Sequence, residues 1–160
     1  MTDATIRFAA DPAAAVRRQC AALCWRMEAD APQILLITSR DTGRWVVPKG
    51  WPMPGLSPAR TAAREAFEEA GVRGTVDERS LGCFGYEKVL GQGAARGLRV
   101  ACVVAVFPLR VEGLEDDFPE AGQRQRAWFA PAEAAARVDE PDLARLLAAF
   151  RPADGDGPAA

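Results

Sequence analysis

The chain has 160 residues, the usual length of one domain, and 49% of them are hydrophobic, although 32 are alanines. Its 20 basic and 22 acidic residues give a net charge of −2, which excludes a general basic surface for nucleic acid. Histidine is absent, so Ser-His-Asp and Cys-His catalysis and zinc sites with histidine ligands are excluded as well.

Composition divides the chain into three segments. Residues 1–16 are rich in alanine and are expected to form a flexible lead-in, and residues 152–160, with two glycines and two prolines, a flexible tail. Residues 17–151 contain no linker, repeat or low-complexity block, so a single domain is expected there. Without a signal peptide or a long apolar run, a cytoplasmic protein with no membrane partner is expected.

Six stretches have the short apolar pattern that predicts β-strands. They cover residues 19–26, 33–39, 44–47, 82–89, 98–109 and 125–129. The fifth stretch is apolar almost throughout, which is typical of a central strand covered on both faces. The four cysteines form no Cys-x-x-Cys pair and lie among apolar residues, so we expect buried free thiols. They are Cys20, Cys24, Cys83 and Cys102.

Three helices are predicted, at residues 57–70, 131–137 and 139–150. The first has the clearest boundaries, because Ser57 suits the N-cap, Pro58 the first helical position and Gly71 the position after the last turn. Strands and helices in this order predict an α/β fold, with a mixed sheet and helices on its faces.

The helix at residues 57–70 separates small apolar residues from acidic ones. One sector of the helical wheel holds Ala59, Ala62, Ala63, Ala66, Phe67 and Ala70. Glu65, Glu68 and Glu69 fall on the other side, close to the C-terminus, where their mutual repulsion and the macrodipole both oppose the helix. Arg64 can pair with Glu68, which leaves two carboxylates to be offset.

Two interpretations of this acidic face remain open. A solvated surface is the ordinary one. Alternatively, a hard divalent cation offsets the repulsion, and oxygen-only ligands point to Mg²⁺ or Mn²⁺. The rigid turn at residues 48–55 favours the cation, because Gly50 allows backbone carbonyls to approach a metal and Lys49 offers a charge to a phosphate.

The segment from Gly50 to Val72 resembles the Nudix box. The family pattern is Gly, five residues, Glu, seven residues, then Arg-Glu-apolar-any-Glu-Glu-any-Gly-apolar. The last part reads Arg64-Glu65-Ala66-Phe67-Glu68-Glu69-Ala70-Gly71-Val72, and the spacing is kept over 23 positions. Leu56 stands where the family has its first Glu, which leaves the number of metal ions open. The resemblance implies a Nudix-type α/β/α sandwich with a central mixed β-sheet, in a single Nudix domain at residues 17–151.

Two further segments are similar to the diphosphoinositol polyphosphate phosphohydrolase branch of this family. They are Arg-Asp-Thr-Gly-Arg-Trp-Val-Val-Pro at 40–48 and Trp-Phe-Ala-Pro at 128–131. That branch cleaves diphosphoinositol polyphosphates and dinucleoside polyphosphates. It has Pro-Gly-Gly where this chain has Pro48-Lys49-Gly50, so Lys49 departs from its pattern.

The resemblance implies hydrolysis of a phosphoanhydride bond with Mg²⁺, or Mn²⁺ in its place. The implied metal ligands or general base are Glu65, Glu68 and Glu69. Which of them takes the proton of the attacking water stays open. Arg64 is implied to orient a glutamate, in the first place Glu68, and the backbone carbonyl of Lys49 or Gly50 to supply another ligand.

Nudix enzymes often take a further acid from a loop outside the box. Glu120 is the candidate that would compensate for Leu56, and Glu115, Asp116 and Asp117 are the others. A solvated acidic loop is the ordinary interpretation of each.

Phosphate contacts are expected from basic and hydroxyl side chains outside the helix. The candidates are Arg18, Ser39, Arg40, Arg44, Lys49, Lys88, Arg124 and Arg126. The excess of 18 arginines over two lysines is equally compatible with genome composition. Tyr86 or Phe84 is a candidate for stacking on a base, with a core role expected for at least one of them.

The favoured function is hydrolysis of a dinucleoside polyphosphate or a diphosphoinositol polyphosphate, so the expected partner is a small molecule. ADP-ribose and nucleoside triphosphates are the alternative substrates. A catalytically weak module that only binds a nucleotide is the alternative from another class, and Leu56 is its main support. Retention of Arg64 with all three glutamates favours the enzyme. The sequence leaves the oligomeric state open.

Overall fold

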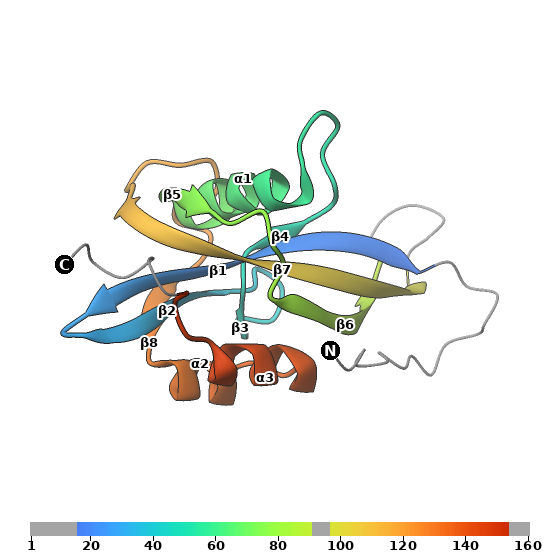
Figure 1. Cartoon of the computed structure of the whole chain (residues 1–160). Helices are drawn as coiled ribbons and strands as arrows, with labels where there is room; N and C mark the ends of the chain where they lie inside the picture. The colour runs from blue at the N-terminus through green and yellow to red at the C-terminus, as the bar shows by residue number, and fades with distance from the viewer. Residues whose placement is uncertain (1–15, 91–96, 154–160) are drawn as a thin grey trace.

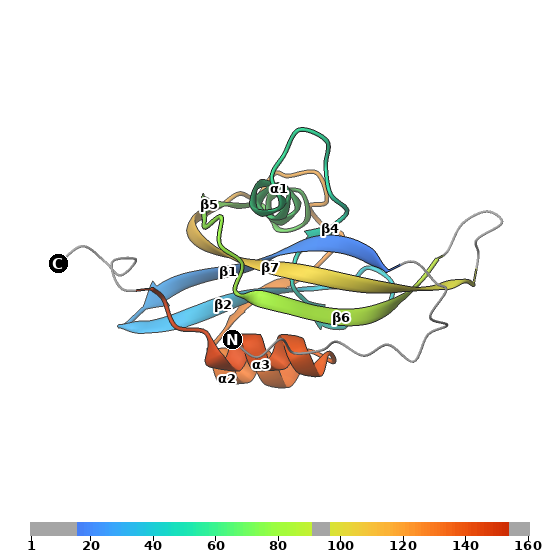
Figure 2. The same ribbon diagram turned by 45° about the vertical axis from the view of Figure 1, so that its right-hand side comes forward.

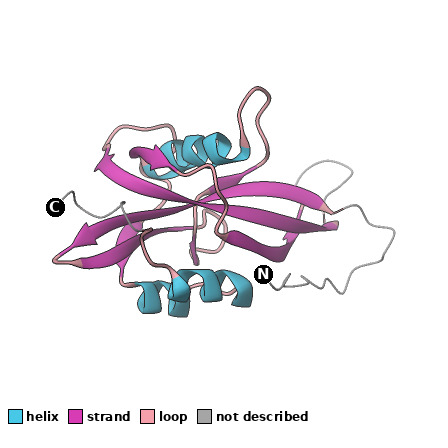
Figure 3. Ribbon diagram, viewed as in Figure 1, coloured by secondary structure: helices cyan, strands magenta, loops and turns pink. Residues whose placement is uncertain are grey.

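The computed structural model describes residues 16–90 and 97–153, which form a β-sheet with helices on both faces (Figures 1 and 3). Helix α1 (Pro58–Ala70) covers one face, and α2 (Pro131–Arg137) and α3 (Pro141–Ala149) cover the other (Figure 2). The predicted α/β/α sandwich with a mixed sheet is therefore confirmed. The expected flexible ends, apart from residues 16 and 152–153, lie outside the described residues.

The described residues contribute eight strands to the sheet. They are β1 (Arg17–Glu28), β2 (Ala31–Thr38), β3 (Trp45–Val46), β4 (Lys49–Gly50), β5 (Val72–Val76), β6 (Gly82–Val89), β7 (Arg99–Leu114) and β8 (Arg126–Phe129). Strands β1 and β7 run parallel to each other at the centre. The edge of β1 that faces away from β7 pairs with β4 and β2, and the edge of β7 that faces away from β1 pairs with β6 and β5. These four pairings are antiparallel.

Alternation along β1 divides the core into two layers. Towards α1 point Cys20, Ala22 and Cys24, and towards α2 and α3 point Ala21, Leu23 and Trp25. The layer under α1 contains small side chains, because the helix buries Ala59, Ala62, Ala66 and Ala70 completely. The other layer contains larger ones, such as Phe84 and Leu147. Helix α1 can therefore approach the sheet closely, which brings its acidic residues near the strands.

Helix α1 has the boundaries that its sequence predicts. The Ser57 side chain accepts a hydrogen bond from the Arg60 backbone N–H, and Gly71 adopts a left-handed conformation with φ of 69°. The buried face differs slightly from the prediction, since Ala63 and Phe67 are only half-buried. Thr61 and Glu69 are buried in their place, at 0% and 5% exposure.

Three features of the strands differ from the prediction. The stretch at 44–47 is shorter, and the chain after Pro48 forms the separate strand β4, paired with Ala21 and Cys20 of β1. Strand β5 was not predicted, because its middle residues are exposed and a bulge at Arg73/Gly74 interrupts its alternation. Strand β7 continues to Leu114 because β5 pairs with its last residues.

The four cysteines are free, as predicted. Cys20, Cys24 and Cys102 are buried, but Cys83 is exposed, so the expectation of burial was wrong for this residue. Cys83 lies at the start of β6, which forms the outer side of the sheet next to β7. In the described part of the chain, no helix is long and apolar enough to cross a membrane.

Candidate active site

A cavity of about 300 Å³ lies beside the acidic side of α1. It is lined by Gln19, Ser39, Arg40, Asp41, Val46, Lys49, Gly50, Trp51, Glu65, Glu69, Lys88, Glu120 and Arg124. These residues come from α1, from strands β1, β3, β4 and β6, and from the loops that follow β2, β4 and β7. Nine of the predicted site residues are among them, so the fold brings together residues that are far apart in the sequence.

Gly50 allows the Glu65 carboxylate to lie against the backbone of β4. A β-carbon built at position 50 would overlap the carboxylate carbon and both carboxylate oxygens of Glu65. The glycine of the motif is therefore required for close approach and not for a turn, since its φ is not positive. Burial, followed by the charges of Glu68 and Glu120, raises the pKa of Glu65 to about 7.

Glu69 is the buried carboxylate of the site, with an exposure of 5%. Its Oε2 accepts a hydrogen bond from the Lys49 backbone N–H at 3.4 Å, and its Oε1 lies 3.6 Å from Nη2 of Arg124. Burial raises the pKa of Glu69 to about 7, although Arg124 acts in the opposite direction. The two carboxylates of α1 in this cavity therefore bind protons more strongly than ordinary glutamates.

Glu120 reaches the cavity because its loop is attached to the end of α1. Its backbone N–H donates to the Glu68 carbonyl at 3.0 Å. Its Oε1 accepts from Nε and Nη2 of Arg124 at 3.2 and 3.1 Å, and Arg40 lies 3.5 Å away. Arg124 therefore lies between Glu69 and Glu120. Within the described ranges, no three acidic or cysteine side chains converge as a preformed metal site.

Lys49 and Lys88 contribute positive charge to the cavity. Nζ of Lys49 lies 5.1 Å from the centre of the Tyr86 ring, and burial lowers the pKa of this lysine. The Tyr86 hydroxyl donates to Oε1 of Gln19 at 2.5 Å. Phe84 is 1% exposed and belongs to the core, so of the two predicted aromatic residues only Tyr86 lies near the cavity.

Three residues predicted to contact phosphate do not line this cavity, and they are Arg18, Arg44 and Arg126. Arg18 lines a separate cavity of about 160 Å³. Arg44 donates to Glu140 at 2.9 Å and to Asp139 at 3.2 Å, which ties the loop before β3 to the start of α3.

Arg126 holds the C-terminus of α1. Its Nη1 donates to the carbonyls of Ala70 and Glu115, at 2.6 and 2.8 Å. This contact supplies the positive charge that the acidic end of the helix requires.

The remaining residues of the motif lie outside the cavity. The Glu68 side chain does not line it, and Arg64 is exposed in a groove on the outer side of α1. Among the described residues, no ion pair joins Arg64 to a glutamate. Leu56 lines that groove and the cavity that contains Arg18.

Four lining residues were not predicted, and they are Gln19, Asp41, Val46 and Trp51. Trp51 has a signal in the sequence, because it directly follows Gly50. Gln19 has the same parity in β1 as Ala21, but only the pairing of β1 with β4 brings it beside Lys49, and the sequence does not indicate this pairing. Asp41 depends on how the loop after β2 folds, which no local pattern indicates.

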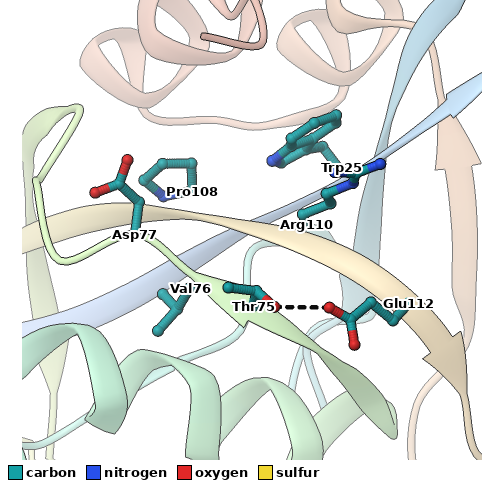
Figure 4. A pocket seen from close by; sticks show the side chains of 7 residues that line it. All are labelled: Trp25, Thr75, Val76, Asp77, Pro108, Arg110 and Glu112. Atoms are coloured by element: carbon teal, nitrogen blue, oxygen red, sulfur yellow. Dashed lines mark hydrogen bonds between the residues drawn. The ribbon is translucent and has the colours of Figure 1, made fainter. Parts of the chain in front are cut away.

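A second cavity, of about 280 Å³, lies between β1, β5 and β7 (Figure 4). Its lining includes Trp25, Asp77 and Arg110, and the Thr75 hydroxyl donates to Glu112 at 2.6 Å. None of the residues predicted for catalysis or phosphate binding lines it. The cavity beside α1 is therefore the candidate active site.

Comparison with known proteins identifies the family and the fold of the chain. The chain matches the NUDIX domain over residues 15–150. It is 36% identical to diphosphoinositol polyphosphate phosphohydrolase 3-alpha of Mus musculus over 115 residues, which are 71% of this chain and 63% of that protein. The chain thus spans less than two thirds of the length of that relative.

Solved structures of low sequence identity share the fold. C. elegans Ap4A hydrolase in a binary complex matches with a TM-score of 0.59 and 20% identity, over 82% of this chain and 93% of that one. E. coli dihydroneopterin triphosphate pyrophosphohydrolase matches with a TM-score of 0.62 and 16% identity, over 83% and 93%.

Proposed function

Since the chain belongs to the Nudix family, we propose that it uses a divalent cation to hydrolyse a phosphoanhydride bond in a polyphosphorylated small molecule. The observation that carries the proposal is the cavity in which Glu65, Glu69 and Glu120 lie beside four cationic side chains. The cations are Arg40, Lys49, Lys88 and Arg124. Carboxylates bind hard metal ions and the cations bind phosphate, so this combination suits a metal-bound polyphosphate.

The donor set fits Mg²⁺, with Mn²⁺ as the alternative. The Glu65 carboxylate has no hydrogen-bond or ion-pair partner among the described residues. Burial, followed by the charges of Glu68 and Glu120, raises its pKa, and a bound cation would favour its ionised form. Glu65, Glu69 and the carbonyl of Lys49 or Gly50 would hold the ion, with Glu120 as a further ligand. Glu68 is the remaining candidate of the motif, although its side chain does not line the cavity. When bound, the ion would neutralise phosphate oxygens and lower the pKa of a water molecule.

The protein's own side chains would bind the phosphates and accept the proton. Lys49 and Lys88 suit the phosphate groups, because both line the cavity on the side of Tyr86 or Trp51. Glu65 and Glu69 are the candidates for the general base, because both carboxylates line the cavity in which the phosphates would lie. Arg124 and Arg40 would hold Glu120 in place.

A dinucleoside polyphosphate or a diphosphoinositol polyphosphate is the favoured substrate. The relative with 36% identity is named for diphosphoinositol polyphosphates, which supports that class. ADP-ribose and nucleoside triphosphates are the alternatives, because each contains a phosphoanhydride that the same cavity would accommodate.

A binding module with little activity is the second candidate function, and Leu56 is the observation that favours it. This position contributes no carboxylate, and its side chain lies outside the cavity of Glu65. Buried Glu69 argues for the enzyme, because a buried carboxylate with a raised pKa costs stability that nucleotide binding alone does not require.

A substrate panel with Mg²⁺ tests the proposal. It includes diadenosine polyphosphates, inositol pyrophosphates, ADP-ribose and nucleoside triphosphates. We expect metal-dependent turnover of at least one compound, abolished in Glu69→Gln and unchanged in the matched variant Glu133→Gln on the exposed side of α2. Tight binding of one compound without turnover of any would establish the binding module instead.

A further inference from the structure

Trp51 is an exposed aromatic residue at the rim of the active-site cavity. Its exposure is 38%, whereas Trp25 is 3% exposed in the core and the other two tryptophans pack partly buried against the core. Exposing an indole costs free energy, because the ring gains by leaving water. A large aromatic surface beside charged groups therefore suggests a ligand that covers it.

The backbone fixes Trp51 close to the carboxylates. Gly50 before it lies against the Glu65 carboxylate, and Pro52 after it restricts Trp51 to an extended conformation. A group that stacks on this indole is therefore held at a short, constant distance from Glu65.

Two cations accompany the ring. The guanidinium carbon of Arg17 lies 6.0 Å from the ring centre, and Nζ of Lys88 lies 5.9 Å from it. Both distances are at the outer limit of a cation–π contact of about 6 Å. Neither cation forms an ion pair with another described residue, so both remain available to an anion.

We propose that Trp51 is the base-stacking residue of the cavity and that the substrate is a nucleoside polyphosphate. The heterocyclic base lies on the indole, and the phosphates extend past Lys88 and Lys49 towards Glu65. An inositol ring has no π-face to stack on the indole, so this arrangement favours nucleotides over inositol pyrophosphates. The inference rests on the proposed function, because it concerns the same cavity.

Binding of two matched ligands tests the role of Trp51 without turnover. The affinities of ATP and of inorganic tripolyphosphate, which has the phosphate chain but no base, are measured by calorimetry in EDTA at low ionic strength. Stacking on an aromatic ring predicts that Trp51→Ala weakens ATP binding about tenfold and tripolyphosphate binding less than about twofold. Trp51→Phe retains most of the ATP affinity, and Leu81→Ala, which removes a similarly exposed side chain outside the cavity, changes neither.

Two results would overturn the inference. An equal loss of affinity for both ligands in Trp51→Ala would mean that the indole only positions the cations, and unchanged ATP binding would mean that no base stacks there. The test is separate from the hydrolase proposal. Metal-dependent hydrolysis by a protein whose ATP affinity is unchanged in Trp51→Ala would refute the stacking and leave the hydrolase intact. If the protein turned over no compound but Trp51→Ala selectively lost ATP affinity, the stacking would stand and the hydrolase proposal would fail.

Discussion

Gly50 fixes the position of Glu65, because a β-carbon at position 50 would overlap the carboxylate. The substitution Gly50→Ala therefore displaces Glu65 from the cavity. We expect Mn²⁺ affinity, followed by titration of the metal, and metal-dependent hydrolysis each to fall about tenfold or more. Stability should change little, since the glutamate can turn towards solvent. The matched control is Gly113→Ala, where the added β-carbon meets nothing within 4 Å, and unchanged Mn²⁺ binding in Gly50→Ala would contradict the role of Gly50.

The raised pKa of Glu65 makes the stability of the metal-free protein depend on pH. The pKa rises from 4.5 to about 7 on folding, so this group favours the folded state fully below pH 4.5 and loses that contribution as the pH rises to about 7. Replacing Glu65 by a neutral glutamine removes this loss of stability at high pH. We expect Glu65→Gln to raise the free energy of unfolding by about 1–2 kcal/mol at pH 8 in EDTA, a value discounted for partial exposure. Urea unfolding at pH 8 and pH 4 measures this, and a gain of equal size at both would contradict it.

Single residues differ in how far the sequence predicts them. Glu65, Glu69 and Gly50 follow from a motif of fixed spacing, because they lie on one helix and in the segment just before it. The burial of Glu69 does not follow, because it depends on the distance between α1 and the sheet. Trp51 has a signal only in its position beside Gly50.

At the level of elements, Arg126 joins the C-terminus of α1 to the loop that carries Glu120. It donates to the carbonyls of Ala70 and Glu115, so Arg126→Gln leaves them unpaired. We expect a loss of about 1–3 kcal/mol in stability, together with a lower rate of hydrolysis, because the loop of Glu120 shifts. Thermal unfolding and kcat measure the two effects.

The outcome for Arg126 separates two roles. If Arg126 only contacted substrate phosphate, Arg126→Gln would raise KM and leave thermal stability unchanged. Arg79→Gln, at an exposed position in the turn after β5, is the matched control and should change neither quantity.

The ends of α1 were predictable because caps are local, whereas Arg126 caps the helix across 56 residues of sequence. For the same reason β5 was missed, since its pairing with the end of β7 and its bulge depend on the tertiary fold.

For the whole molecule, alternation and helix periodicity predicted a sheet between two helical layers, because burial of one apolar face determines both patterns. The sequence could not predict which strands and loops contribute residues to the cavity. Lys49 and Gly50 line the cavity because β4 pairs with β1 before Cys24, the first residue of β1 that pairs with β2, and this register has no local sequence signal.

The two layers should respond differently to mutation, because α1 carries the carboxylates and α3 does not. In the layer under α3, Leu147→Ala removes a fully buried side chain and should cost about 2–5 kcal/mol of stability, with Mn²⁺ affinity retained at temperatures where the protein stays folded. In the layer under α1, Ala62→Leu should cost about 1–3 kcal/mol and also weaken Mn²⁺ binding, because the larger side chain lifts the helix away from the sheet. Ala132→Leu, on the exposed side of α2, is the control for the added volume. If Leu147→Ala weakened Mn²⁺ binding as strongly as Ala62→Leu in folded protein, the metal site would depend on both layers and the placement on α1 alone would be wrong.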